Sequence, residues 1–200
     1  LTIADDECTV PTDTARFSLF IREPLELDSL STVDTLLCDG EEIELSMYTT
    51  KGDGNYAYQW TSGMQSFGTA SSARFYADSL AKGVNTITAW VIDGCGSADS
   101  QSILVFVPDN LSANIGNDLV LCNGQQSLLT SSYAGGLSDR YSFQWKLRNT
   151  SVSATDSFNF NGVGHSLFRD SSIQVAFSLD DGCMNPVSDT LIINISPKVV

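Results

Sequence analysis

The chain has 200 residues, of which 42% are hydrophobic and 17% are charged, so it can form the core of one large or two ordinary domains. Its 24 acidic and 10 basic residues give a net charge of −14, which excludes nucleic acid and anionic lipid surfaces as expected partners, because both would be repelled. No apolar run approaches the roughly 18 residues of a membrane-spanning helix, so we expect no direct membrane insertion.

An acidic turn with one cysteine lies near the start of the chain and occurs twice more. It reads Asp5-Asp6-Glu7-Cys8, then Asp93-Gly94-Cys95, then Asp180-Asp181-Gly182-Cys183, so its cysteines are 87 and 88 residues apart. A Leu-Cys-x-Gly turn has nearly the same period, because Cys38 and Cys122 are 84 residues apart. Such self-similarity indicates tandem repeats. We predict the last two strands of a preceding repeat at 1–24, whole repeats at 25–108 and 109–197, and an onward linker at 198–200.

Each whole repeat has the pattern of an all-β domain. Apolar and polar residues alternate around 43–47, 56–60, 86–92 and 102–107, and again around 141–147, 173–179 and 191–195. This period of two predicts strands with one buried face, and no segment predicts a helix. About seven short strands in one repeat, with a tryptophan on the third, are typical of an immunoglobulin-like Greek-key β-sandwich. The fold class is therefore all-β, with Trp60 and Trp145 in the two cores.

The five cysteines allow two disulfide schemes. The first joins Cys38 to Cys95 and Cys122 to Cys183, within each repeat. The second joins Cys38 to Cys183 between repeats, because the turn before the second strand faces the following repeat and the turn after the sixth faces the preceding one. In both schemes the partner of Cys8 lies outside the chain. Single cysteines with no CxxC pair favour disulfides over zinc, and hence an extracellular or cell-surface location.

The order of these motifs resembles a known class of repeat. Leu-Cys-x-Gly, then Tyr/Phe-x-Trp, then Asp-x-Gly-Cys and a closing Asp-Ser/Thr strand is similar to the PKD-like and Ig-like repeats of Bacteroidota surface proteins. That resemblance implies an adhesin of the gliding-motility type, exported by type IX secretion. Asp-Ser/Thr-apolar tripeptides likewise resemble the O-glycosylation acceptor of that phylum. They occur at Thr14, Ser29, Thr35, Ser79 and Thr190.

The sequence offers little for catalysis. Its single histidine, His165, lies in a glycine-rich segment with no Gly-x-Ser-x-Gly motif nearby, so we expect no enzyme and no cofactor. Calcium is the one metal to consider, because hard cations bind several converging carboxylate and carbonyl oxygens. The weak candidates, which match no EF-hand loop, are Asp93, Asp180 and Asp181, with Asp5 and Asp6 in the first copy of the turn.

Two functions follow from this organisation. The first is that of non-catalytic spacer repeats in a large secreted or cell-surface adhesin or filament, whose partners are neighbouring repeats of the same polypeptide. The alternative is a recognition module for surface polysaccharide or other surface proteins, which could be accessory to an enzyme elsewhere in the polypeptide. An exposed aromatic patch would favour recognition. The aromatic residues considered for it are Phe67, Phe75, Tyr76, Phe158 and Phe160.

Overall fold

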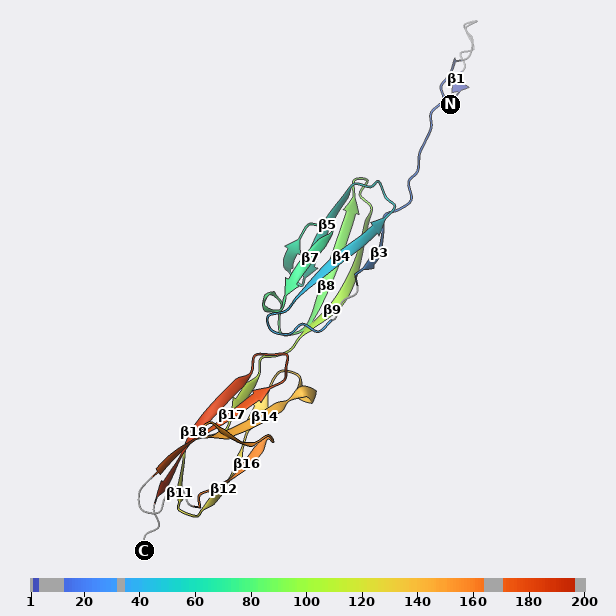
Figure 1. Ribbon diagram of the computed structural model, residues 1–200. Helices are drawn as coiled ribbons and strands as arrows, with labels where there is room; N and C mark the ends of the chain where they lie inside the picture. Colours follow the sequence, from blue (N-terminus) through green and yellow to red (C-terminus); the bar gives the residue numbers. More distant parts are fainter. Residues whose placement is uncertain (1, 4–12, 32–34, 164–170, 197–200) are drawn as a thin grey trace.

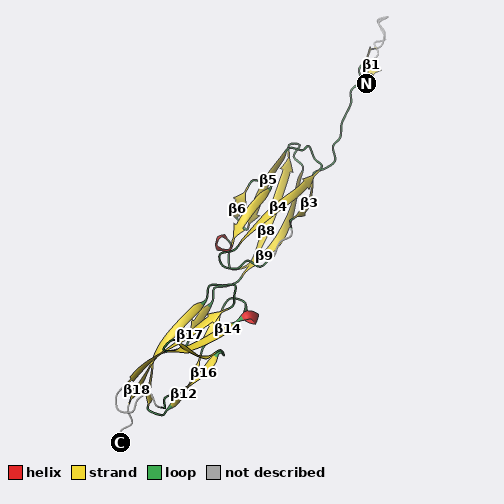
Figure 2. Ribbon diagram, viewed as in Figure 1, coloured by secondary structure: helices red, strands yellow, loops and turns green. Residues whose placement is uncertain are grey.

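The computed structural model describes residues 2–3, 13–31, 35–163 and 171–196. It contains two β-sandwiches arranged end to end along one axis (Figure 1). Almost all regular structure is strand, and the two helices among the described residues are single 3₁₀ turns, η1 (Ala77–Ser79) and η2 (Ser138–Arg140) (Figure 2). Neither of these helices has the length and apolar character needed to cross a membrane. The prediction of an all-β fold is confirmed.

The first sandwich packs two antiparallel sheets against each other. One sheet has the order β3-β4-β7 and the other the order β6-β5-β8-β9. Strands that are distant in the sequence are therefore neighbours, as in a Greek key. The strands are β3 (Glu26–Leu30), β4 (Glu42–Thr50), β5 (Tyr56–Ser62), β6 (Gln65–Gly68), β7 (Ser72–Tyr76), β8 (Gly83–Asp93) and β9 (Ala98–Val107).

The core of the first sandwich forms because alternate residues of both sheets point inward. Trp60 on β5 is fully buried and meets Phe75 of the opposite sheet edge to face, with ring centroids 5.9 Å apart. Its indole Nε1 donates a hydrogen bond of 3.0 Å to the carbonyl oxygen of Ala70, so the one polar atom of the ring is satisfied. Burial of Trp60 and of the inward residues of β4 and β8 holds the two sheets together.

The second sandwich repeats this plan. Its largest sheet has the order β11-β18-β17-β14-β15, and two further pairs, β12-β16 and β10-β13, complete it. β11 pairs with β18 in parallel, whereas the other pairs are antiparallel. The strands are β10 (Ser112–Asn114), β11 (Leu119–Cys122), β12 (Gln126–Thr130), β13 (Ser132–Ala134), β14 (Ser142–Leu147), β15 (Thr150–Ser153), β16 (Ser157–Asn161), β17 (Ser171–Asp180) and β18 (Val187–Ser196).

Trp145 has the same place in the second core that Trp60 has in the first. It is fully buried, and its Nε1 donates a hydrogen bond of 2.9 Å to the carbonyl oxygen of Thr155. In both sandwiches the acceptor lies ten residues after the tryptophan. The packing around Trp145 differs in detail, because Phe177 of the neighbouring strand lies 4.9 Å from it, where the first sandwich has Ala89.

Two short strands precede the first sandwich. β1 (Thr2–Ile3) and β2 (Asp13–Thr14) pair antiparallel, and residues 15–24 lead from them to the first sandwich (Figure 1). Cys8 lies outside the described residues, as does His165. The interpretation of 1–24 as the end of a preceding repeat, and the repeat boundaries as a whole, remain predictions.

Candidate functional site: the joint between the sandwiches

The turn before β4 presents Cys38 to the second sandwich. The backbone N–H of Cys38 donates to the Glu41 carboxylate at 2.9 Å, and the N–H of Glu41 donates to the Cys38 carbonyl oxygen at 3.1 Å. Gly40 between them has a φ of 76°, the left-handed region that glycine adopts at least cost. Two local hydrogen bonds and this glycine therefore fix the direction of the cysteine.

The turn between β17 and β18 presents Cys183 from the other side. Asp181 is 3% exposed, and its carboxylate accepts hydrogen bonds from the N–H groups of Cys183, Met184 and Leu137, at 3.0, 2.7 and 2.6 Å. Burial by itself would raise the pKa of Asp181, but these backbone donors outweigh it and hold the pKa below its ordinary value. The buried carboxylate therefore stays ionised and shapes the turn.

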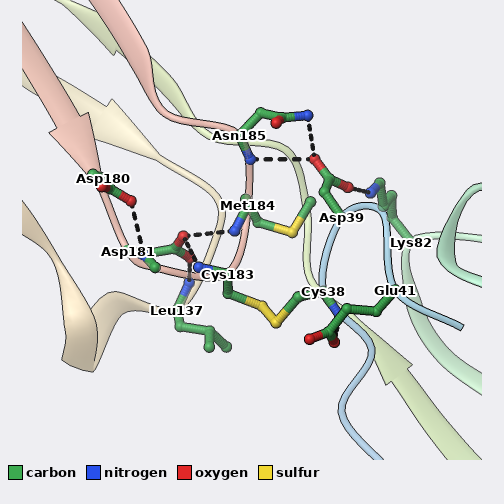
Figure 3. The surroundings of a disulfide bond; sticks show 11 residues. Cys38, Asp39, Glu41, Lys82, Leu137, Asp180, Asp181, Cys183, Met184 and Asn185 are labelled. Carbon is green, nitrogen blue, oxygen red and sulfur yellow. Dashed lines mark hydrogen bonds and ion pairs between the residues drawn. A yellow bond between two sulfur atoms is a disulfide. The ribbon is translucent and has the colours of Figure 1, made fainter.

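The two turns meet in a disulfide between Cys38 and Cys183, whose Cα atoms are 4.8 Å apart (Figure 3). The pairing within each repeat, Cys38 with Cys95 and Cys122 with Cys183, is wrong for this structure, because Cys95 and Cys122 are free. The reason is the length of the sandwich. β8 has 11 residues, so the turns at its two ends are roughly 30 Å apart at about 3.3 Å per residue, much farther than a disulfide reaches.

Polar and apolar contacts surround the disulfide. The Asp39 carboxylate accepts hydrogen bonds from the backbone N–H and the side-chain amide of Asn185, at 3.2 and 3.0 Å, and pairs with the Lys82 ammonium at 3.2 Å (Figure 3). The N–H of Asp39 donates to the Cys183 carbonyl oxygen at 3.1 Å. Leu36 and Cys38 of the first sandwich pack against the core of the second. The joint is thus a small interface in which a covalent bond is one of several contacts.

The outer end of each sandwich carries one turn of the kind found at the joint. Its cysteine is a free thiol, Cys95 in the first sandwich and Cys122 in the second. The N–H of Cys122 donates to the Gln125 side chain at 2.6 Å and the N–H of Gln125 to the Cys122 carbonyl oxygen at 3.0 Å, as at Cys38. Asp93 accepts from the N–H groups of Cys95 and Ser97 at 3.0 and 2.8 Å, as Asp181 does in its own turn. Cys95 and Cys122 are both exposed.

The calcium candidates have other partners. Asp93 and Asp181 are buried and accept backbone hydrogen bonds in their turns, and Asp180 accepts one from the N–H of Gly182 at 2.8 Å. Among the described residues, no three His, Cys, Asp or Glu side chains converge as a metal would require. Asp5 and Asp6 lie outside the described residues. In the two acidic turns that the structure describes, the aspartates cap the backbone of the turn.

The predicted acceptors of O-linked sugar are scattered over the molecule. Ser29, Thr35 and Thr190 are exposed, and Thr14 lies in β2. The hydroxyl of Ser79 is occupied, because it donates to the Tyr76 carbonyl oxygen at 2.7 Å and accepts from the Tyr76 N–H at 3.2 Å. Modification of these positions remains a prediction, and the Ser79 hydroxyl already has a structural role.

The aromatic residues considered for recognition do not form a surface patch. Phe75 and Phe160 are fully buried, Phe67 packs on Phe75, Phe158 packs on Trp145, and Tyr76 is the one that is largely exposed. Trp90, which is not among these predicted candidates, is 48% exposed on β8. The alternation around 86–92 contains the signal, because buried Ala89 and Val91 direct the residue between them outward.

The fold and the joint define a class of protein, that of tandem immunoglobulin-like β-sandwiches. An I-band fragment of titin is similar to this chain with a TM-score of 0.57 and 10% identity, over 86% of this chain and 66% of the fragment. A mutated variant of three immunoglobulin domains of titin is similar with a TM-score of 0.58 and 11% identity, over 86% of this chain and 65% of the other. The chain thus spans slightly less than two thirds of either structure. At 10 to 11% identity the similarity shows a shared fold and nothing more. No protein-family model and no curated protein matches the chain.

Proposed function

We propose that the chain is a non-catalytic spacer, made of the repeats 25–108 and 109–197, in a secreted or cell-surface adhesin or filament. The observation that supports this proposal is the joint at Cys38 and Cys183, which joins two sandwiches by a covalent bond, hydrogen bonds and apolar packing. A hinge between independent modules would have few contacts across it, whereas a stalk that sets reach needs a fixed angle between its units. The disulfide also favours an oxidising, extracellular compartment.

The resemblance to Bacteroidota repeats supports a finer proposal, that of a gliding-motility-type adhesin exported by type IX secretion. In such a stalk each joint would be made by the same pair of turns. Cys95 would then bond the turn of a preceding repeat, and Cys122 that of a following one. Peptide mapping of the whole surface protein without reduction tests this, since it should find both cysteines linked to equivalent turns. Free thiols at both positions would contradict it.

The joint itself is tested by substitution of its cysteines. In the native chain, ¹⁵N relaxation should report one elongated body in which both sandwiches tumble together. We expect Cys38→Ser with Cys183→Ser to give faster and unequal tumbling of the two sandwiches. Loss of the cross-link should also lower stability by about 2 to 4 kcal/mol. Cys95→Ser with Cys122→Ser is the matched control, because it removes the same number of thiols and leaves the joint intact. Equal tumbling in all three chains would contradict the role of the disulfide.

A further inference from the structure

One outer face of the first sandwich is apolar near the end of β8. Trp90 and Ile92 on β8 point away from the core and are 48% and 46% exposed. In the register of the sheet, Trp90 lies between Gln59 of β5 and Ser100 of β9, and Ile92 lies between two alanines. Directly opposed residues of neighbouring strands lie within about 5 Å of each other at Cβ, so these side chains form one continuous surface.

In β5, β8 and β9, all of which lie within the described residues, no outward position carries a charged side chain. The outward positions of β5, β8 and β9 are occupied by apolar, hydroxyl and amide side chains, although the protein has a net charge of −14. The opposite sheet is different, because Glu42 and Glu44 of β4 flank Arg74 of β7 in an exposed ladder of charges. The uncharged outward residues are Ala57, Gln59, Thr61, Val84, Thr86, Thr88, Trp90, Ile92, Ala98, Ser100, Ser102, Leu104 and Phe106.

A groove of about 360 Å³ runs beside Trp90. Gln59, Thr69, Ile92 and Ala98 also line it. This volume is at the lower end of the range for small-molecule sites, and the mixture of an apolar floor with a few polar groups is typical of them. Most of its lining residues lie on the paired strands β5, β8 and β9.

The second sandwich shows that the fold does not need this face. Trp60 pairs with Ala89 and Trp145 pairs with Phe177, which makes Ser178 the equivalent of Trp90 and Asp180 the equivalent of Ile92. At the other end of the sheet, the equivalent of Phe106 is Asn194. The positions of Trp90, Ile92 and Phe106 are therefore apolar in the first repeat and polar in the second, so the fold does not require apolar residues there.

We propose that the Trp90 face binds a neutral polysaccharide, a function beyond that of a spacer. The apolar face of a sugar ring stacks on the exposed indole, and its hydroxyls exchange hydrogen bonds with the Gln59 amide and the Ser100 hydroxyl. Charge selects this ligand. The field of the protein repels anionic chains, cationic partners are attracted to the acidic faces, and two copies of the chain repel each other. A neutral ligand is not repelled by the negative charge of the protein and is not attracted to its acidic faces instead.

The three tryptophans make the test specific. Trp60 and Trp145 are fully buried, so acrylamide quenching of the folded chain reports on Trp90. Titration of the full chain with cellohexaose, xylohexaose and mannohexaose should give a saturable fluorescence change with at least one of them, and protection of Trp90 from acrylamide. Trp90→Ser, which copies Ser178, should weaken this binding about tenfold as measured by calorimetry, with little change in melting temperature.

Ile192→Ser on β18 is the matched control, because Ile192 is 42% exposed on the same face of the second sandwich. We expect it to leave binding unchanged. Absence of a saturable signal with every neutral glycan would overturn the proposal. So would equal binding of polygalacturonate, since charge would then select nothing. Sedimentation that shows a dimer lost in Trp90→Ser would assign the face to a second copy of the chain instead. None of these outcomes bears on the joint at Cys38 and Cys183.

Discussion

The two sandwiches are alike in their cores and at their ends, and they differ on one outer face. Both have a tryptophan whose indole bonds a carbonyl oxygen ten residues later, and both have a cysteine turn closed by a reciprocal pair of hydrogen bonds. Trp90 has Ser178 as its counterpart. Features that the fold and the joints require occur in both repeats. The fold does not require the exposed Trp90 that one repeat has, and we assign it to binding.

The largest expected effects concern the two core tryptophans. Trp60→Ala and Trp145→Ala should each lower the free energy of unfolding of the sandwich that carries the change by about 3 to 5 kcal/mol. Each substitution leaves a cavity in a packed core. Trp90→Ala should lower the free energy of unfolding by less, about 1 kcal/mol, since Trp90 is 48% exposed and its removal leaves no cavity in a core. Denaturant unfolding, monitored by hydrogen exchange in each sandwich, measures the free energy of unfolding of each variant. Equal losses for all three variants would break the distinction between core and binding face.

The next comparison is between the two buried aspartates. Asp181→Asn should cost about 2 kcal/mol, because three backbone donors lose a charged acceptor. Asp93→Asn should lower the free energy of unfolding by less. In its turn the Asp93 carboxylate accepts from the two N–H groups of Cys95 and Ser97, compared with three donors at Asp181. Urea titration of both variants beside the native chain measures the two losses. A larger loss for Asp93→Asn would contradict this assignment of the two turns.

The effect of Asp181 should also depend on pH. Its pKa is lower in the folded chain than the ordinary 3.8, so its stabilisation is present above that value and is lost as the pH falls through the lower, folded-state pKa. The stability difference between the native chain and Asp181→Asn should therefore be largest near neutral pH and shrink below about pH 4. A difference that is constant from pH 7 to pH 2 would show that the carboxylate charge is not what stabilises the turn.

The smallest expected effects concern the glycines of the cysteine turns. Gly40 and Gly124 have φ values of 76° and 86°, and a Cβ at either position would meet no atom within 4 Å. Alanine should therefore cost about 1 kcal/mol at each, from backbone strain alone. Gly68→Ala is the control, because Gly68 has no positive φ and its added Cβ would make an ordinary contact with Ala73. Thermal unfolding of the three variants should show equal decreases in melting temperature for the Gly40 and Gly124 variants. That result would support the equivalence of the turn at the joint and the turn at the free end.

Much of the architecture followed from local pattern. Alternation around Trp60 and Trp145 predicted strands and cores, because a strand points successive side chains to opposite faces and burial selects one of them. The period of the cysteine turns predicted the repeat. For the same reason the outward direction of Trp90 was contained in the sequence, although its importance was not, since one exposed tryptophan on a strand carries no signal by itself.

The sequence by itself determined the all-β class and the strands around the two tryptophans. It also limited the disulfides to two schemes without deciding between them. Only the tertiary structure decided between the schemes, and it alone brought Asp39, Lys82 and Asn185 to the joint and Gln59 and Ser100 to the sides of Trp90. The physical reason is the range of the interactions. Alternation acts between neighbours in the chain, whereas the joint connects residues 145 positions apart and the face depends on the register of strands that are paired in space.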